Sequence, residues 1–194
     1  MPASNLILAS SSPFRRELLD RLGLPFESIS PEVDESILKG EIPTDYVQRL
    51  AQAKAQAIAE QHPQALVIGS DQCAYLDGEI LGKPGSHSTA VNQLRNASAR
   101  EVVFYTGLTL TRVSSNFLRT SCIKYRVGFR TLNDQEIERY LHQEQPYNCA
   151  GSFKSEGLGI TLFSYMRGDD PTALIGLPLI ELADMLREAG MPLP

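Results

Sequence analysis

Hydrophobic residues follow two different spacings along the chain, and these spacings predict its secondary structure. Short apolar runs are typical of buried strands, whereas apolar residues that recur every three or four positions are typical of helices. The predicted strands are Leu6–Ala9, Phe26–Ser30, Ala65–Asp71, Glu101–Arg112 and Cys122–Arg130, with a hairpin that turns at Asp77 and Gly78. The predicted helices run from Pro13 towards Gly23, from Asp45 to Gln61 with Thr44 as its cap, from Ser88 to Ala97, from Asn133 to Glu144, and from Gly176 towards Gly190. Because strands and helices alternate but hairpins interrupt them, we expect a mixed α/β sheet with helices packed on it.

The first helix carries two cations at the end where acidic residues are normally found. Ser12 followed by Pro13 is typical of a helix start, with the serine as N-cap. Arg15 and Arg16 then fall in the first turn, next to the positive end of the helix dipole. This placement indicates that an anion binds there.

Lys54 lies in the middle of the apolar face of the long second helix, beside Val47, Leu50 and Ile58. A lysine in this position must extend to solvent, lose its proton or meet a negative partner. The sequence leaves two interpretations open: a lysine that extends to solvent at the edge of the sheet, or a cation directed at phosphate groups.

Two groups of carboxylates follow predicted strands. Asp71 ends an otherwise apolar strand, and Glu32, Asp34 and Glu35 lie in the turn after an earlier one. Ligand sites of α/β sheets gather at the carboxyl ends of strands. Each group taken alone also fits a solvated turn or a helix cap. Together with the cations, however, the carboxylates suit a site for Mg²⁺ and phosphate.

Two glycine-containing segments carry further charges. Lys83 lies in "GKPG", and Lys154 and Glu156 lie in "GSFKSEGLG", whose glycines would let the backbone approach a ligand. The chain contains no Gly-x-x-x-x-Gly-Lys-Ser/Thr sequence, so we expect no Walker A loop.

Composition excludes several classes of function. The formal net charge of -5 argues against general nucleic-acid binding, which needs a basic surface. We find no apolar run long enough for a membrane span, and no basic segment followed by an apolar core at the N-terminus, so we expect neither a membrane anchor nor a secretion signal. The widely spaced Cys73, Cys122 and Cys149 predict free thiols in a reducing cytoplasm.

Several motifs, taken in order, resemble those of the Maf family of nucleotide pyrophosphatases over essentially the whole chain. They are "LILASSSPFRRELL", "EVDES", "RLAQAKA", "VIGSDQ", "GKP", "FYTGL", "CAGSFKSEGLG" and "GLPL". The resemblance implies an ITPase-like α/β fold, a mixed twisted sheet with flanking helices and two lobes around a central substrate groove. It also implies hydrolysis of a nucleoside triphosphate to the monophosphate and pyrophosphate, with a divalent cation (Mg²⁺, Mn²⁺ or Co²⁺).

The resemblance assigns roles to residues that the pattern of charges had already marked as unusual. Asp71 matches the catalytic base, and whether it acts as base, metal ligand or both stays open. Glu35 and Asp71 are the expected metal ligands. The expected phosphate-binding residues are Ser10, Arg15, Arg16, Lys54 and Lys83.

Three further positions bear on the substrate. Family members that act on dTTP and UTP have Arg, Thr and Gln where this chain has Phe14, Gln72 and Glu156. The present set is similar to the branch that acts on 7-methyl-GTP, in which the first position is commonly Trp. A cationic 7-methylguanine favours an aromatic face and a carboxylate, which Phe14 and Glu156 would supply, while Gln72 can read a base edge. From periodicity alone, Phe14 would instead join the core beside Leu18.

We therefore expect one Maf-like domain over residues 1–194 that hydrolyses 7-methyl-GTP in the cytoplasm. A dTTP/UTP-type pyrophosphatase and a nucleotide-binding regulator of cell division with incidental hydrolysis are the alternatives. The expected partner is a small nucleoside triphosphate, with no nucleic acid and no membrane. A homodimer is left open.

Overall fold

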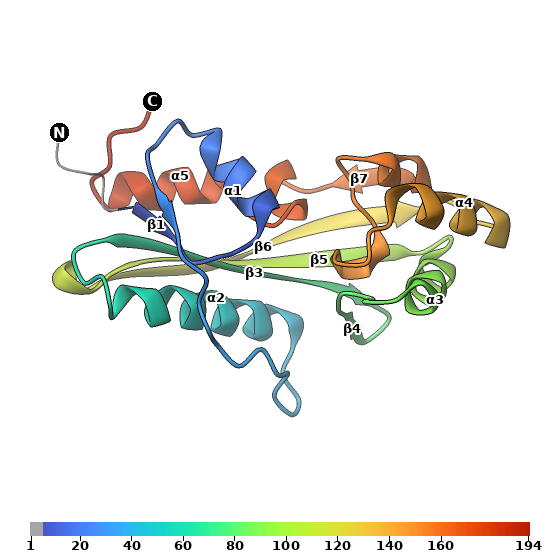
Figure 1. Cartoon of the computed structure of the whole chain (residues 1–194), viewed down its shortest axis with the longest axis horizontal. Helices are drawn as coiled ribbons and strands as arrows, with labels where there is room; N and C mark the ends of the chain where they lie inside the picture. The colour runs from blue at the N-terminus through green and yellow to red at the C-terminus, as the bar shows by residue number, and fades with distance from the viewer. Residues whose placement is uncertain (1–5) are drawn as a thin grey trace. The chain divides into compact units, whose positions relative to one another are not determined.

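The computed structural model describes residues 6–194, which form a mixed α/β fold (Figure 1). Within these residues one sheet contains seven strands in the order β2-β1-β3-β5-β6-β7, with β4 paired to β3. Strand β1 runs parallel to β2 and β3, whereas β4 is antiparallel to β3 and β7 is antiparallel to β6. The strands are β1 Leu6–Leu8, β2 Glu27–Ser28, β3 Leu66–Leu76, β4 Glu79–Leu81, β5 Glu101–Arg112, β6 Phe117–Phe129 and β7 Phe163–Arg167. The predicted mixed sheet is confirmed.

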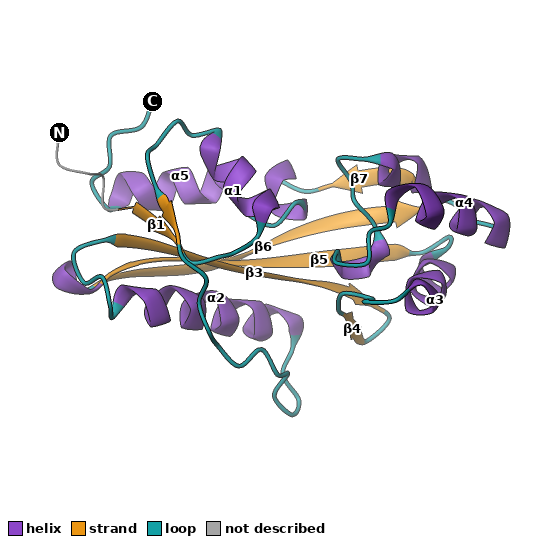
Figure 2. Cartoon of the chain, viewed as in Figure 1, coloured by secondary structure: helices purple, strands orange, loops and turns teal. Residues whose placement is uncertain are grey.

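Helices follow several of the strands in the chain, and short 3-10 turns join other elements (Figure 2). The helices are α1 Pro13–Asp20, α2 Pro43–Ala59, α3 His87–Ala97, α4 Asp134–Glu144 and α5 Leu179–Glu188. The 3-10 turns are Val113–Ser115, Ala150–Ser152, Leu158–Leu162 and Pro171–Leu174. Among the helices of residues 6–194, none has both the length and the apolar character that crossing a bilayer requires.

The described residues group into two compact units, and strands β3, β5 and β6 contribute to both. Among the described residues, unit 1 holds residues 6–71, 106–123 and 170–194, and unit 2 holds residues 72–105 and 124–169. A single domain over the whole chain, and a groove between two lobes, stay predictions.

The core of unit 1 follows from the alternation of side chains along its strands. Leu6 and Leu8 of β1 face one side, where helices α1 and α5 cover the sheet, and Ile7 faces the other side, where α2 lies (Figure 1). The first side also buries the α1 residues Leu18 and Leu19. The sheet of unit 1 is therefore covered by helices on both faces, which is why its strands read as continuous apolar runs.

Unit 2 has an aromatic core and a pair of packed helices. Phe153 lies edge-on to Phe104, Phe129 and Phe163, with ring centroids 5.2, 5.6 and 4.8 Å away. Helix α3 packs against α4 in the same unit (Figure 1). Edge-to-face rings of this kind add to the stability that their burial provides.

Local signals for element ends were largely right. Ser12 caps α1, with Pro13 as its first residue, and Asn133 and Glu136 form the predicted capping box of α4. The hairpin between β3 and β4 turns at Asp77 and Gly78, which both have positive φ. These features are confirmed because each depends on a few consecutive residues.

Other bounds were wrong. Strand β3 continues past Asp71 to Leu76, because residues 74–76 pair with β4. Helix α2 begins at Pro43 and has no side-chain cap, so Thr44 is not the cap. Strand β6 begins at Phe117 rather than at Cys122. In this additional part of the strand, the Thr120 side chain shares a hydrogen bond with the side chain of Thr109 in β5. The pairing of β7 with β6 was not predicted.

Helix α2 touches two strands of unit 1 at the level of the backbone. A Cβ atom at Gly69 of β3 would lie 2.1 Å from the carbonyl oxygen of Ala51. At Gly107 of β5 it would lie 2.1 Å from the carbonyl oxygen of Val47. Both glycines are therefore needed for the close approach of the helix.

We expect Gly107→Ala to lower the free energy of unfolding by about 1–3 kcal/mol, because the added methyl group must push α2 away from the sheet. Urea denaturation measures this loss. Gly82→Ala is the matched control, since a Cβ there meets nothing within 4 Å. Equal denaturation midpoints for the two variants would contradict the close approach.

Candidate functional site

Three charged side chains of unit 1 form an ion cluster. The Lys54 ammonium lies 2.6 Å from Oδ1 of Asp71 and 2.6 Å from Oε1 of Glu35. The side chains of Lys54 and Asp71 are only 9% and 10% exposed, whereas Glu35 is 57% exposed. Lys54 therefore does not extend to solvent from the edge of the sheet; it meets negative partners beneath the surface. We call Glu35, Lys54 and Asp71 the ion cluster.

The cluster is assembled from three segments that are distant in sequence. Lys54 lies on the buried face of α2, and Asp71 lies within β3 rather than at its end. Glu35 belongs to the loop between β2 and α2. Because a buried ion needs a partner to offset its lost hydration, each member of the buried Lys54–Asp71 pair depends on the other.

Helix α2 also holds the loop that carries Glu35. The Tyr46 hydroxyl donates to the carbonyl oxygen of Glu35 at 3.1 Å, and Arg49 donates to the carbonyl oxygen of Ser36 at 3.0 Å. Arg49 also pairs with Glu41 at 2.6 Å, and this hydrogen bond lowers the pKa of the Glu41 carboxyl. The loop is thereby tied to the same helix that supplies Lys54.

Arg15 is held in place by the end of α1 and by a backbone carbonyl. Its backbone N–H donates to the Ser12 hydroxyl at 3.4 Å, and its Nε donates to the carbonyl oxygen of Gly176 at 2.9 Å. The Ser70 hydroxyl donates to the same carbonyl oxygen at 2.9 Å. Ser10 is buried and accepts from Nη1 of Arg15 at 3.5 Å. Neither Ser70 nor Gly176 was predicted as a site residue, because nothing in the sequence around either of them points to Arg15.

The charges of the ion cluster also act on Arg15. Burial lowers the pKa of its guanidinium, while the negative charges of Asp71 and Glu35 raise it. The structure therefore brings five of the predicted residues together in unit 1, namely Ser10, Arg15, Glu35, Lys54 and Asp71.

The two neighbours of Arg15 differ in their surroundings. Arg16 is exposed, and its guanidinium forms no ion pair or side-chain hydrogen bond within residues 6–194. Phe14 is half-buried, whereas Leu18 and Leu19 are fully buried. The core face of α1 thus begins with the leucines, and Phe14 lies at its margin.

The remaining predicted residues lie in unit 2. Gln72 is half-buried and follows Asp71 in β3, while Lys83 and Glu156 are exposed. The pKa of the Cys149 thiol is raised, mainly by burial and next by the negative charge of Glu156. The positive charges of Lys154 and Lys83 lower this pKa in part. Lys83, Lys154 and Glu156 therefore act on the same thiol.

The surroundings of Cys149 do not favour a nucleophilic thiolate. The raised pKa of Cys149 keeps its sulfur protonated, and only a thiolate is an effective nucleophile. No disulfide joins Cys73, Cys122 or Cys149 within residues 6–194, so their thiols are unoxidised in this structure, as predicted.

The segment that carries Glu156 packs closely on α4. The backbone N–H of Lys154 donates to the Tyr140 hydroxyl at 3.1 Å, and that of Leu158 donates to Glu144 at 2.7 Å. A Cβ at Gly157 would lie 2.6 Å from a carboxylate oxygen of Glu144. Gly157 therefore permits a close contact within the chain; that the glycines of this segment let the backbone approach a ligand stays a prediction.

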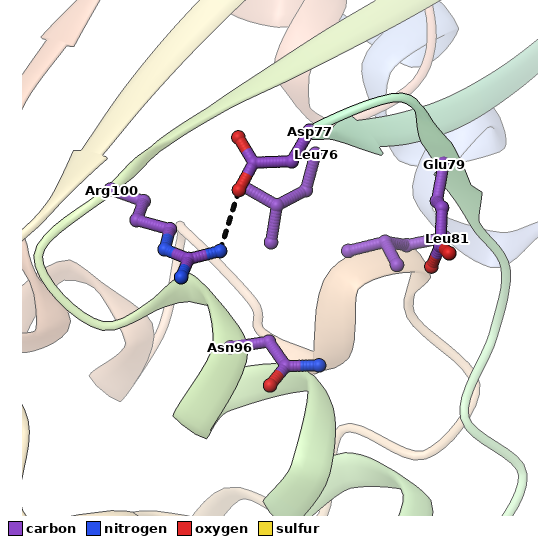
Figure 3. A pocket seen from close by; sticks show the side chains of 6 residues that line it. All are labelled: Leu76, Asp77, Glu79, Leu81, Asn96 and Arg100. Atoms are coloured by element: carbon purple, nitrogen blue, oxygen red, sulfur yellow. Dashed lines mark hydrogen bonds and ion pairs between the residues drawn. The ribbon is translucent and has the colours of Figure 1, made fainter.

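A separate pocket of unit 2 is lined by none of the predicted site residues. Figure 3 shows its lining, in which Arg100 turns towards Asp77 and pairs with it at 2.5 Å. The other lining residues are Leu76, Glu79, Leu81 and Asn96. The pocket lacks a nucleophile with an adjacent base, so the ion cluster is the better candidate for chemistry.

Comparisons with known proteins agree on one family. A family model described as "Maf-like protein" matches residues 5–189. A protein of Pseudomonas aeruginosa named 7-methyl-GTP pyrophosphatase is 54% identical over 98% of this chain and 99% of its own length. A protein of Aromatoleum aromaticum with the same name is 52% identical over the full length of both chains.

One solved structure was also similar. The Staphylococcus aureus Ham1 protein aligns with 96% of this chain and 99% of its own, at a TM-score of 0.48 and 15% identity. Values this low assign neither fold nor function.

We expect Lys54→Met to lower the free energy of unfolding by about 3–5 kcal/mol, because it leaves the Asp71 carboxylate buried without its cation. Arg187→Met is the control, since it breaks an exposed pair with Asp184 and should cost less than about 1 kcal/mol. Chemical denaturation of both variants measures the difference. A Lys54→Met protein as stable as the control would show that the pair is not an effective buried interaction.

Proposed function

This chain belongs to the Maf family, and from that premise we propose that it hydrolyses nucleoside triphosphates to monophosphates and pyrophosphate, with 7-methyl-GTP as its preferred substrate. The names of the relatives support this proposal. The observation that carries it is the ion cluster, in which a buried lysine joins two carboxylates. A cluster of this composition offers both a proton acceptor and a cation within one small region.

The balance of charge in unit 1 favours a metal-bound triphosphate. The cations Lys54 and Arg15 are matched in number by the anions Glu35 and Asp71. This set by itself cannot neutralise the several negative charges of a triphosphate. A divalent cation that enters with the nucleotide would supply the missing positive charge.

The donor set fits such a cation. The carboxylates of Glu35 and Asp71 already converge on one positive group, the Lys54 ammonium. Mg²⁺ is commonly held by one or two carboxylates together with water and phosphate oxygens, and Mn²⁺ and Co²⁺ accept similar ligands. When bound, the cation would polarise the phosphate oxygens and make a bound water more acidic.

Side chains of this chain would accept the proton of the attacking water and stabilise the charge of the leaving group. Asp71 would accept a proton from the water that attacks the α-phosphorus, and pyrophosphate would leave. Lys54, Arg15 and the exposed Arg16 would donate to phosphate oxygens as negative charge builds up on the leaving group. Ser10, already hydrogen-bonded to Arg15, would offer its hydroxyl to a phosphate oxygen. For Lys83 of unit 2, the proposed phosphate-binding role is supported only by the family resemblance of its "GKP" motif.

Base selection is assigned to Phe14, Gln72 and Glu156. Methylation at N7 makes guanine cationic, so an aromatic face and a carboxylate should favour it over unmodified guanine. The half-buried state of Phe14 supports this role, because a ring at the margin of the core still has surface to offer. The same three residues argue against a dTTP/UTP-type enzyme. A cytoplasmic location and a homodimer stay predictions.

We expect Asp71→Asn to lower the rate of pyrophosphate release from 7-methyl-GTP with Mg²⁺ by at least about 100-fold, because an amide cannot accept the proton. Asp77→Asn is the matched control, since Asp77 lies in the hairpin turn and pairs with Arg100. Near-normal release by Asp71→Asn would refute the catalytic role. A wild-type protein that retains nucleotide without releasing pyrophosphate would favour the regulator.

We expect Glu156→Gln to lower kcat/KM for 7-methyl-GTP about tenfold relative to GTP, because only the methylated base is cationic. Initial rates on a panel of 7-methyl-GTP, GTP, dTTP and UTP measure this ratio. Glu79→Gln, an exposed carboxylate of the same unit, should leave it unchanged. Equal losses on all nucleotides would remove the base-reading role, and faster hydrolysis of dTTP or UTP by the wild type would favour the alternative enzyme.

A further inference from the structure

A second group of potential metal ligands lies in unit 2, on the packed helices α3 and α4 (Figure 1). His87 is the first residue of α3, and Glu138 and His142 lie one turn apart on α4. One ligand atom from each of these residues lies within 4.8 Å of the other two. The proposed hydrolysis uses none of them. We call this group the histidine cluster.

The geometry of the histidine cluster centres on the Glu138 carboxylate. Oε2 of Glu138 lies 2.8 Å from Nε2 of His87 and 3.6 Å from Nε2 of His142. The two imidazole rings lie 5.2 Å apart between centroids. All three donor atoms therefore face a common region between the helices.

Tyr147 orients the His87 ring. Its hydroxyl lies 2.9 Å from Nδ1 of His87, on the opposite side of the ring from Glu138. The carbonyl oxygen of Tyr147 accepts from the backbone N–H of Gly85 at 3.0 Å, which ties Tyr147 to the segment before α3. Metal-binding histidines usually have their second ring nitrogen fixed by such a hydrogen bond, so that the first one points at the metal.

We propose that His87, Glu138 and His142 form a binding site for Zn²⁺ or a closely similar transition-metal cation. In a tetrahedral zinc site the bonds are about 2.0–2.2 Å long and the ligand atoms are about 3.4 Å apart. The 2.8 and 3.6 Å separations from Glu138 lie on either side of that value, and the ligand atoms of the two histidines lie within 4.8 Å of each other. Side-chain shifts of about 0.5–1.5 Å would therefore bring all three ligand atoms to zinc distances. Water completes the fourth position, since the His142 side chain is 73% exposed.

Binding has a defined proton balance. Without metal, the contact between Nε2 of His87 and Oε2 of Glu138 is a hydrogen bond that needs a proton between the two atoms. The cation takes the place of this proton, and both atoms become ligands. In a neutral His87 ring the proton is then carried by Nδ1, which faces the Tyr147 hydroxyl; in a protonated ring Nδ1 already carries one, and the Nε2 proton passes to solvent.

The ligand chemistry separates this site from the ion cluster. Imidazole nitrogens suit Zn²⁺, Cu²⁺ and Ni²⁺, whereas Mg²⁺ prefers an all-oxygen environment. The ion cluster offers only carboxylate oxygens, and the histidine cluster offers two nitrogens and one carboxylate. Zn²⁺ bound here would link the start of α3 to α4 and thereby stabilise unit 2.

Zn²⁺ binding to the purified chain tests the proposal without reference to hydrolysis. After treatment with a chelator and in the presence of a non-thiol reductant, isothermal titration with Zn²⁺ should give one site per chain. At a free concentration of 100 times the Kd, Tm should rise by about 5 °C or more. Millimolar Mg²⁺ should neither compete at this site nor cause the same rise.

Variants locate the site. His142→Ala, at an exposed position that folding should tolerate, should weaken Zn²⁺ binding by at least about 100-fold and abolish the rise in Tm. Tyr147→Phe should weaken it by about tenfold, because the orienting hydroxyl is lost. His62→Ala changes a histidine of unit 1 outside the histidine cluster and should bind as the wild type does.

Two results would overturn the inference. One is a wild-type chain that binds no Zn²⁺ in titration, which would make the cluster an ion pair that only joins α3 to α4. The other is undiminished Zn²⁺ affinity in His142→Ala, which would place the metal elsewhere, for instance at a cysteine. Neither result bears on pyrophosphate release, so the two proposals fail or succeed separately.

Discussion

The pairing of Lys54 with Asp71 inside unit 1 is the constraint on which the rest of the candidate site depends. Neither charge could remain beneath the surface alone, because the loss of hydration would exceed any gain from packing. The pair therefore fixes the position of α2 against β3. It also draws in Glu35, whose loop is tied to the same helix by Tyr46 and Arg49. The negative charges of Asp71 and Glu35 in turn raise the pKa of Arg15, against the lowering by burial.

Backbone packing makes this pairing geometrically available. Gly69 and Gly107 let α2 lie directly on two strands, so that a side chain in the middle of the helix can reach an acid within the sheet. On the other face of the same strands, Ser70 and Arg15 share the carbonyl oxygen of Gly176. Ser70 and Asp71 are successive residues of β3, and successive side chains of a strand point to opposite faces. The strand therefore places Asp71 beside α2 and Ser70 beside the Gly176 carbonyl that also accepts from Arg15.

The chain offers two different environments for cations. The carboxylates of the ion cluster suit a hard cation that arrives with phosphate oxygens, and the histidine cluster suits a cation that prefers nitrogen. The ion cluster belongs to the hydrolysis proposed for this chain, whereas the histidine cluster lies where helices α3 and α4 pack together. A chain with both can respond to two metals through separate residues.

The amino-acid sequence by itself determined the features whose signals are local. The cap at Ser12, the capping box at Asn133 and the turn at Asp77 and Gly78 each depend on a few neighbouring residues, and the apolar spacing placed most helices and strands. Sequence also marked Lys54 as out of place on an apolar face. Only the tertiary structure decided that Glu35 and Asp71 are the acids that pair with Lys54. It also decided that β3 continues beyond Asp71, and that His87 lies beside Glu138 and His142. The physical reason is that ion pairs and ligand groups depend on distances in space, which residues far apart in the chain acquire only when the sheet and its helices pack together.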